Sequence, residues 1–67
     1  MAGVFQFADL VGTSPRSIEE AVQAAVTEAG RMLEKVYWFE VKEVRGRIDG
    51  GSIAEYQVSV RVAGKKE

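Results

Sequence analysis

Apolar residues recur with a helical period in the first half of the chain and alternate with a strand period in the second half. Residues three and four positions apart share one face of a helix, whereas strand side chains alternate between two faces. Ahead of both patterns, residues 4–11 are short and rich in apolar side chains, which predicts a first strand. Phe5 and Phe7 would share one face of this strand. The Gly-Thr-Ser-Pro cluster at residues 12–15 is typical of a turn.

The helical pattern predicts one helix over residues 18–36. Its apolar stripe consists of Ile18, Ala21, Val22, Ala25, Ala29, Met32, Leu33 and Val36. Ser17 is the expected N-cap, with Glu20 reaching back to complete a capping box. The alternative start is Ser14, with Pro15 at the first helical position. Gly30 interrupts the helix at a cost of up to about 1 kcal/mol, which a close packing contact at this position would explain.

Two strands joined by a hairpin follow the helix. Residues 37–48 are rich in aromatic and β-branched side chains, and residues 53–62 alternate cleanly between apolar and polar. The Asp-Gly-Gly-Ser sequence at residues 49–52 predicts the hairpin turn, and residues 64–67 are expected to fray. The order β-α-β-β indicates an α+β domain. Its hairpin strands are antiparallel neighbours and its helix covers one face of the sheet.

Composition narrows the chemistry of this chain. Its 67 residues predict a single domain over residues 1–67, and they include no cysteine and no histidine. Disulfides, thiol nucleophiles and imidazole bases are therefore excluded, and zinc lacks its usual ligands. We expect no catalytic residues and no metal site. For so small a core, oligomerisation is the remaining route to extra stability.

Charge and hydropathy restrict the partners. A formal net charge of −1 argues against nucleic acid, which usually requires a basic excess. No apolar run is long enough for a membrane helix, and the N-terminus lacks the features of a signal peptide. We therefore expect a cytoplasmic protein with neither a membrane nor a nucleic-acid partner.

Trp38, the only tryptophan, lies on the polar face of the second predicted strand. Phe39 and Val41 share the other face and are expected to pack against the helix. Trp38 then projects with Glu40 on the side that also carries Gln57. A large exposed aromatic side chain indicates an interaction surface. Three interpretations stay open: packing against a neighbouring subunit, stacking on a planar ligand beside the amide of Gln57, or an ordinary surface position.

Arg45 and Arg47 lie later on the same strand. Unbroken alternation places both on the face of Phe39, but Val44 would then lie on the polar face. A bulge or a strand bend near residues 43–46 is therefore expected. Arginine is suited to bidentate contact with phosphate, while two solvated or ion-paired arginines on an edge strand are the alternative.

Taken together, these residues resemble the dodecins, a family of small flavin-binding proteins. The resemblance covers about residues 4–62. It is carried by Val11-Gly12-Thr13-Ser14, Trp38-Phe39-Glu40-Val41, Arg45-Gly46 and Tyr56-Gln57-Val58. It implies a three-stranded antiparallel sheet wrapped around one long helix, and twelve subunits assembled into a hollow sphere. It also implies that flavins bind in antiparallel pairs between subunits, for storage, buffering or quenching of their photochemistry, without catalysis.

The resemblance also implies roles for single residues. Trp38 would stack on the isoalloxazine ring, opposed by a symmetry-related copy, and Gln57 would hydrogen-bond the polar edge of the flavin. Arg45 matches a basic position associated with the phosphate of FMN. This match favours FMN over riboflavin and leaves FAD open, and Arg47 is the neighbouring candidate. Lys65 could replace the basic residue of the family's C-terminal Gly-Phe-Arg-Leu-Glu-like segment.

Two departures from the family pattern stand out. Bacterial members commonly have an acidic residue where this chain has Tyr37, and the aromatic residue of the C-terminal segment is missing. Some bacterial members bind coenzyme A. The missing aromatic residue counts against the same contact in this chain. The alternative to flavin binding is a purely structural homo-oligomer, in which Trp38 is interface packing.

Overall fold

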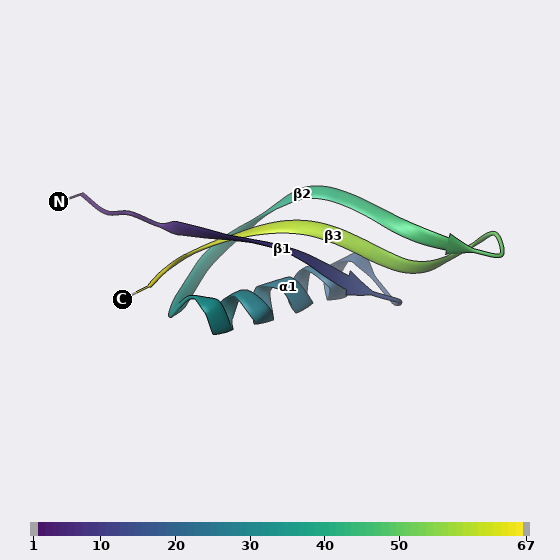
Figure 1. Ribbon diagram of the computed structural model, residues 1–67, viewed down its shortest axis with the longest axis horizontal. Coiled ribbons are helices and arrows are strands. Elements are labelled where there is room, and N and C mark those ends of the chain that lie inside the picture. The colour runs from purple at the N-terminus through teal and green to yellow at the C-terminus, as the bar shows by residue number, and fades with distance from the viewer. Residues whose placement is uncertain (1, 67) are drawn as a thin grey trace.

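The computed structural model describes residues 2–66 and confirms the order β-α-β-β (Figure 1). Strand β1 (Gln6–Ser14) leads into helix α1 (Ile18–Met32), and the long strands β2 (Lys35–Asp49) and β3 (Ser52–Lys65) form a hairpin. The three strands make one antiparallel sheet in the order β1-β3-β2, so β3 lies in the middle. The helix lies along one face of this sheet, and we call the opposite face the outer face (Figure 1).

The helix is shorter than its apolar stripe predicts. It ends at Met32, because Leu33 has extended backbone angles (φ −118°, ψ 147°). The N–H of Glu34 already donates to the carbonyl oxygen of Lys65 at 3.0 Å, so the chain has entered the sheet at this point. Val36 lies on β2, yet it packs against the same core, which explains why it fits the helical pattern.

The strands extend beyond their predicted ends. β1 includes Gly12 and Ser14, which pair with β3, so the turn predicted over residues 12–15 begins only after Ser14. β3 continues to Lys65, so residues 64 and 65 are not frayed, and Gly64 is buried. A Cβ on Gly64 would collide with the carbonyl oxygen of Lys35 on the neighbouring strand β2. Residue 67 lies outside the described part of the chain.

Small side chains bring the helix close to the sheet. Ala21, Ala25 and Ala29 form the buried stripe of α1. They face the buried side chains of the sheet: Ala8, Val58, Val60 and Val62. At Gly12 even one added carbon would collide with the carbonyl oxygen of Ala21. The glycine is therefore required by the close approach of helix and strand.

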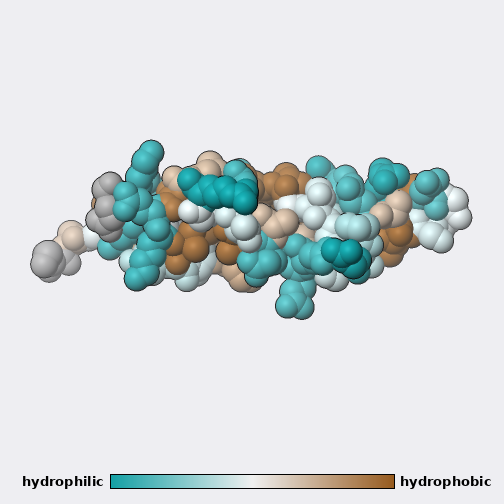
Figure 2. Space-filling model, turned by 90° about the horizontal axis from the view of Figure 1, so that it is seen from below, coloured by the Kyte–Doolittle hydropathy of each residue, from teal (hydrophilic) through white to brown (hydrophobic). Residues whose placement is uncertain are grey.

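The helix covers β1 and β3 but leaves the same face of β2 largely open. Phe39 and Val41 lie on the helix side, as predicted, yet they are 51% and 44% exposed, so the prediction that they pack against the helix is wrong. A helix is about 10 Å across and strands are about 4.8 Å apart, so one helix covers little more than two strands. Figure 2 shows the resulting apolar surface beside the helix and again toward the hairpin. The uncovered large side chains on this side include Ile18, Phe39, Val41, Val44, Ile48 and Ile53.

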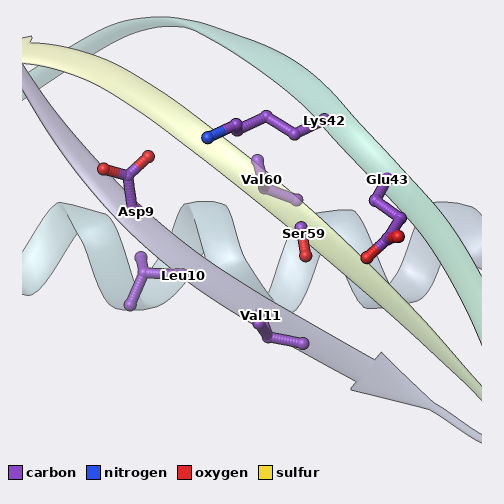
Figure 3. Close-up of a pocket in the computed structure, with 7 residues that line it drawn as sticks. All are labelled: Asp9, Leu10, Val11, Lys42, Glu43, Ser59 and Val60. Carbon is purple, nitrogen blue, oxygen red and sulfur yellow. The ribbon is translucent and has the colours of Figure 1, made fainter.

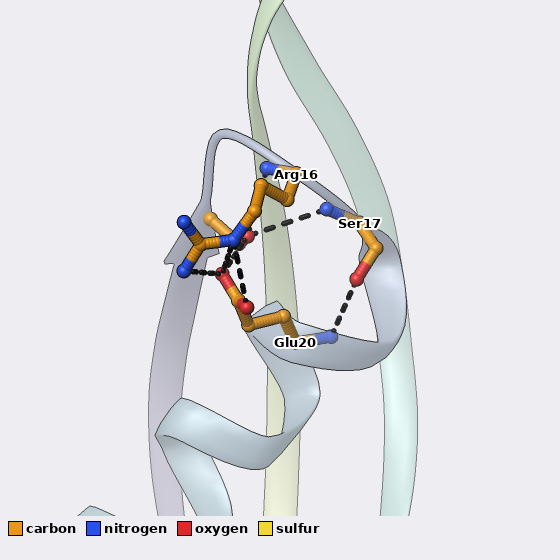
Figure 4. A network of polar contacts seen from close by, with 4 residues as sticks. Arg16, Ser17 and Glu20 are labelled. Carbon is orange, nitrogen blue, oxygen red and sulfur yellow. Dashed lines mark hydrogen bonds and ion pairs between the residues drawn. The ribbon is translucent and has the colours of Figure 1, made fainter.

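The start of the helix is fixed by both serines that the sequence offers as caps (Figure 4). Ser17 is the N-cap, and its Oγ accepts a hydrogen bond from the N–H of Glu20 at 3.0 Å. The return half of the capping box is absent, because the Glu20 carboxylate accepts from the buried Ser14 hydroxyl (2.6 Å) and from Arg16 instead. The N–H of Ser17 donates to Ser14 Oγ at 3.3 Å. Glu20 therefore ties the helix to the end of β1.

Gly30 does not mark a close packing contact within the chain. It is exposed, and a Cβ at this position would meet no described atom within 4 Å. The predicted packing explanation is therefore wrong for the single chain.

Helix α1 lacks the length and apolarity that crossing a bilayer requires, and the part of the chain described has no other helix.

Gly12→Ala is expected to lower the free energy of unfolding by about 1–3 kcal/mol, because the new methyl group pushes the Ala21 carbonyl away. Gly30→Ala is the matched control. It adds the same methyl group to open helix surface and should raise the free energy of unfolding by up to about 1 kcal/mol. Urea unfolding at one protein concentration, followed by circular dichroism, measures both. Changes of the same sign would contradict the packing described for Gly12.

The hydrogen bonds from Ser14 and Arg16 hold the pKa of Glu20 below its ordinary value of 4.5. The unfolded chain therefore takes up this proton first, so the stabilisation is present above about pH 4.5 and is lost as the pH falls below it. We expect Glu20→Gln to remove this part of the acid sensitivity. Glu19→Gln, which changes the same charge in the same turn, should retain it. Thermal unfolding between pH 3 and 7 tests this, and identical pH profiles for wild type and Glu20→Gln would contradict it.

Candidate functional site

The outer face of the sheet carries the residues singled out in the sequence. Directly paired residues of antiparallel strands share a face, so the register divides this face into rows across β1, β3 and β2. The rows are Phe7–Ala63–Trp38, Asp9–Arg61–Glu40, Val11–Ser59–Glu43 and Thr13–Gln57–Arg45. Trp38 and Gln57 thus share the outer face, as predicted.

Trp38 and Gln57 lie at different ends of this face. Trp38 is opposite Ala63, six residues from Gln57 along β3, which corresponds to about 20 Å. One ring system cannot contact both side chains of the same chain. The prediction that they share a face is confirmed, but the single chain does not bring them together.

A bulge in β2 brings Arg45 to the outer face. The register shifts between Val41 and Glu43, so Lys42 is the extra residue, just before the predicted range 43–46. The shift moves Val44 to the helix side, opposite Val58, and turns Arg45 toward Gln57. The sequence predicts a bulge here, because without one a valine faces water and the arginine faces the core.

Arg45 and Gln57 are in direct contact. Arg45 Nε donates to Gln57 Oε1 at 3.0 Å, and Gln57 Nε2 donates to Glu55 Oε1 at 3.0 Å. The Arg45 guanidinium also lies 3.6 Å from Glu43. A primary amide has two donors and two acceptor lone pairs, so one of each stays free on Gln57 for a ligand. Arg47 lies one row farther toward the hairpin, opposite Glu55.

The other end of the outer face is an aromatic cluster around Trp38. Phe5 and Phe7 both meet the indole edge to face, with ring centroids 4.9 and 6.2 Å away. Phe5 also contacts Tyr37 at 5.2 Å. Trp38 remains 42% exposed within the single chain. The indole is therefore braced by perpendicular rings and still available for stacking.

Cationic side chains surround this cluster. Arg61 lies over the ring of Phe7 at 4.7 Å, and Lys65 lies over the ring of Phe5 at 5.0 Å. Lys35 and Lys65 both approach Tyr37, at 5.4 and 6.0 Å. Lys65 therefore lies near Trp38, at the end of the face opposite to Arg45. These cations lie against the faces of the aromatic rings.

Sequence reasoning missed part of this cluster. The shared face of Phe5 and Phe7 is confirmed, but their contact with Trp38 depends on pairing between distant strands. Tyr37, which departs from the family pattern, also belongs to the cluster. It joins the cluster because a register irregularity falls between Val36 and Trp38. The sequence does contain a signal for this cluster. Aromatic residues gather at 5 and 7 and again at 37–39, in two segments that belong to one sheet.

A shallow depression of about 430 Å³ separates the two ends (Figure 3). Asp9 and Lys42 extend toward each other across β3, while Glu43 and Ser59 lie farther toward the hairpin (Figure 3). Arg61 Nε donates to Asp9 at 3.0 Å, and this hydrogen bond lowers the pKa of Asp9, with a smaller contribution from the charge of Lys42. The middle of the face is thus a charged strip between an aromatic end and an Arg45–Gln57 end.

The fold and this face define a class of small α+β proteins. In this class the single helix packs on one face of the sheet, and the opposite face presents aromatic and charged side chains to neighbours or ligands. The dodecin family model matches residues 4–66. The chain is 43% identical over 67 residues to dodecin of Thermus thermophilus, with 100% of this chain and 97% of the relative covered. The chain therefore belongs to the dodecin family.

Solved structures agree with this assignment. Dodecin from Streptomyces coelicolor superposes with a TM-score of 0.88 at 41% identity, over 96% of this chain and 91% of that one. A calcium dodecin from Mycobacterium tuberculosis, described as a calcium-chelating antigen, gives a TM-score of 0.81 at 30% identity, over 97% and 93%. The strand order and the single helix are thus those of known dodecins.

Proposed function

We propose that this protein is a non-catalytic flavin-binding protein that stores, buffers or photoprotects FMN or riboflavin. The observation that carries the proposal is the position of Trp38. Its indole meets two phenylalanine rings in T-shaped contacts and is 42% exposed on a sheet face that no helix or strand within residues 2–66 covers. A planar ring that stacks on it gains dispersion and quadrupole contacts at little reorganisation cost. Membership of the dodecin family supports the same conclusion.

The site is proposed to lie between subunits of a homododecamer. The separation of about 20 Å between the rows of Trp38 and Gln57 supports this arrangement, because a second chain must bring one of them to the ring. The exposed apolar side chains of β2 on the helix side support assembly, since exposed apolar surface of this kind marks subunit contacts. In this arrangement flavin pairs are enclosed by two symmetry-related Trp38 indoles.

The charges indicate where a phosphate would bind. Arg45 offers its guanidinium beside the Gln57 amide, and Lys65 offers its ammonium beside the aromatic cluster. Arginine binds phosphate with parallel hydrogen bonds, which favours FMN over riboflavin at the Arg45 end. Lys65 is the candidate for a second contact with an anionic group of the ligand. The same contact could be made with the phosphates of FAD or coenzyme A.

One relative is described as a calcium dodecin. Within residues 2–66 of this chain, no three His, Cys, Asp or Glu side chains gather so that they could hold a metal ion.

Titration of FMN and riboflavin into purified protein is expected to quench flavin fluorescence at micromolar protein. Trp38→Ala should abolish most of the quenching, while Trp38→Phe should retain part of it, because stacking on a smaller ring is weaker. A colourless particle of about 88 kDa, twelve chains of 7.3 kDa, that quenches neither flavin would contradict the proposal and favour the structural homo-oligomer. Equal quenching by wild type and Trp38→Ala would also contradict it.

Arg45→Gln is expected to weaken FMN binding roughly tenfold and to leave riboflavin binding within about twofold, since only FMN carries the phosphate. Arg47→Gln, one row farther along, should have a smaller effect. Arg31→Gln is the control, because Arg31 pairs with Glu28 on the helix. Fluorescence titrations at two salt concentrations measure these affinities. An equal loss for both flavins would show that Arg45 does not contact the phosphate.

A further inference from the structure

The indole nitrogen of Trp38 is held by a neighbour that the proposed flavin contacts do not use. Trp38 Nε1 donates a hydrogen bond to Glu40 Oε2 at 3.1 Å. The two residues are next neighbours on the outer face of β2, so the carboxylate reaches the indole from the adjacent row. A hydrogen bond at the nitrogen lies in the plane of the ring, so it does not itself occupy a face of the indole.

Glu40 belongs to a row of charges across the sheet. It lies directly opposite Arg61 on β3, and Arg61 lies directly opposite Asp9 on β1. Arg61 Nε donates to Asp9 at 3.0 Å. This hydrogen bond and, to a smaller extent, the negative charge of Glu40 raise the pKa of Arg61. The guanidinium is thus held by Asp9, and its charge attracts the carboxylate of Glu40 from the directly opposite position.

Arg61 reaches Trp38 by a second route. Its guanidinium lies 4.7 Å from the ring centre of Phe7, and the Phe7 ring meets the indole at 89° with centroids 6.2 Å apart. The indole is therefore hydrogen-bonded to Glu40 at Nε1 and linked to Arg61 through the ring of Phe7. Rotation of the indole would break the hydrogen bond at Nε1 and the edge contact with Phe7 together.

We propose that Glu40 and Arg61 are positioning residues that hold the indole of Trp38 in its stacking orientation before any ligand binds. A preformed stacking surface does not lose the rotamer entropy of Trp38 when the ligand arrives, so binding is stronger. The ligand part of this inference rests on the proposed flavin binding. The orientation of Trp38 does not, because it is a property of the ligand-free protein.

The single tryptophan provides the readout. All tryptophan fluorescence and the tryptophan fine structure of the near-ultraviolet circular dichroism come from Trp38. In ligand-free Glu40→Thr, whose threonine suits a strand but is too short to reach Nε1, we expect weaker fine structure and lower tryptophan anisotropy. Glu40→Gln keeps an acceptor oxygen and should restore most of both signals. Glu28→Gln, on the helix, is the control for loss of a charge and should match wild type.

A variant of Arg61 and a measurement of FMN affinity form the second part of the test. Arg61→Gln should lower the same two signals, and its effect should not add to that of Glu40→Thr, because both act on one side chain. FMN binding by Glu40→Thr should weaken roughly three- to tenfold. If wild type binds no flavin but Glu40→Thr still loses the ligand-free signals, the positioning role stands and the proposed function fails.

Unchanged fine structure and anisotropy in ligand-free Glu40→Thr would overturn the inference, whatever the flavin affinity. If that variant does not fold, the NMR signal of the Trp38 indole N–H in the wild-type protein tests the hydrogen bond to Glu40 instead. Slow exchange with solvent and a resonance position that moves in Glu40→Gln support the hydrogen bond. Exchange as fast as that of a free indole overturns it.

Discussion

The close approach of the helix to β1 and β3 is the constraint on which the rest of the structure depends. Alanines at every fourth position and the missing side chain at Gly12 let α1 lie almost on the backbone of the sheet. A helix this close covers only the strands beneath it. The helix side of β2 and the whole outer face are left without cover, and both become available to neighbours or ligands.

A single bulge then decides what the outer face presents. Without Lys42 as an extra residue, Arg45 would point to the helix side and Val44 to water. With it, Val44 joins the apolar side and Arg45 meets Gln57 on the outer face. The same insertion lets Lys42 approach Asp9 across the central strand (Figure 3). One irregularity in strand pairing thus corrects the apolar pattern and creates the polar end of the face.

Much of this could be predicted from the sequence. The element order, the hairpin, the cap at Ser17 and the face of Trp38 follow from local periodicity and turn residues, which depend on neighbours in the chain. The early end of the helix and the exposure of Phe39 could not be predicted in this way. They depend on the width of the helix and on pairing with the C-terminal end of β3. The contacts of Trp38 with Phe5 and Glu40 also needed the register and the rotamers of the folded chain.

The spacing along β3 also relates the small size of the chain to the position of its proposed ligand site. An outer face built from three strands is long and narrow, within a molecule of 54 × 18 × 13 Å. Its aromatic end and its Arg45–Gln57 end lie too far apart to act on one small ligand in a single chain. In the proposed homododecamer, the aromatic end of one chain would lie beside the polar end of another. In that proposed arrangement, a short sequence would build an enclosed site that its own core is too small to contain.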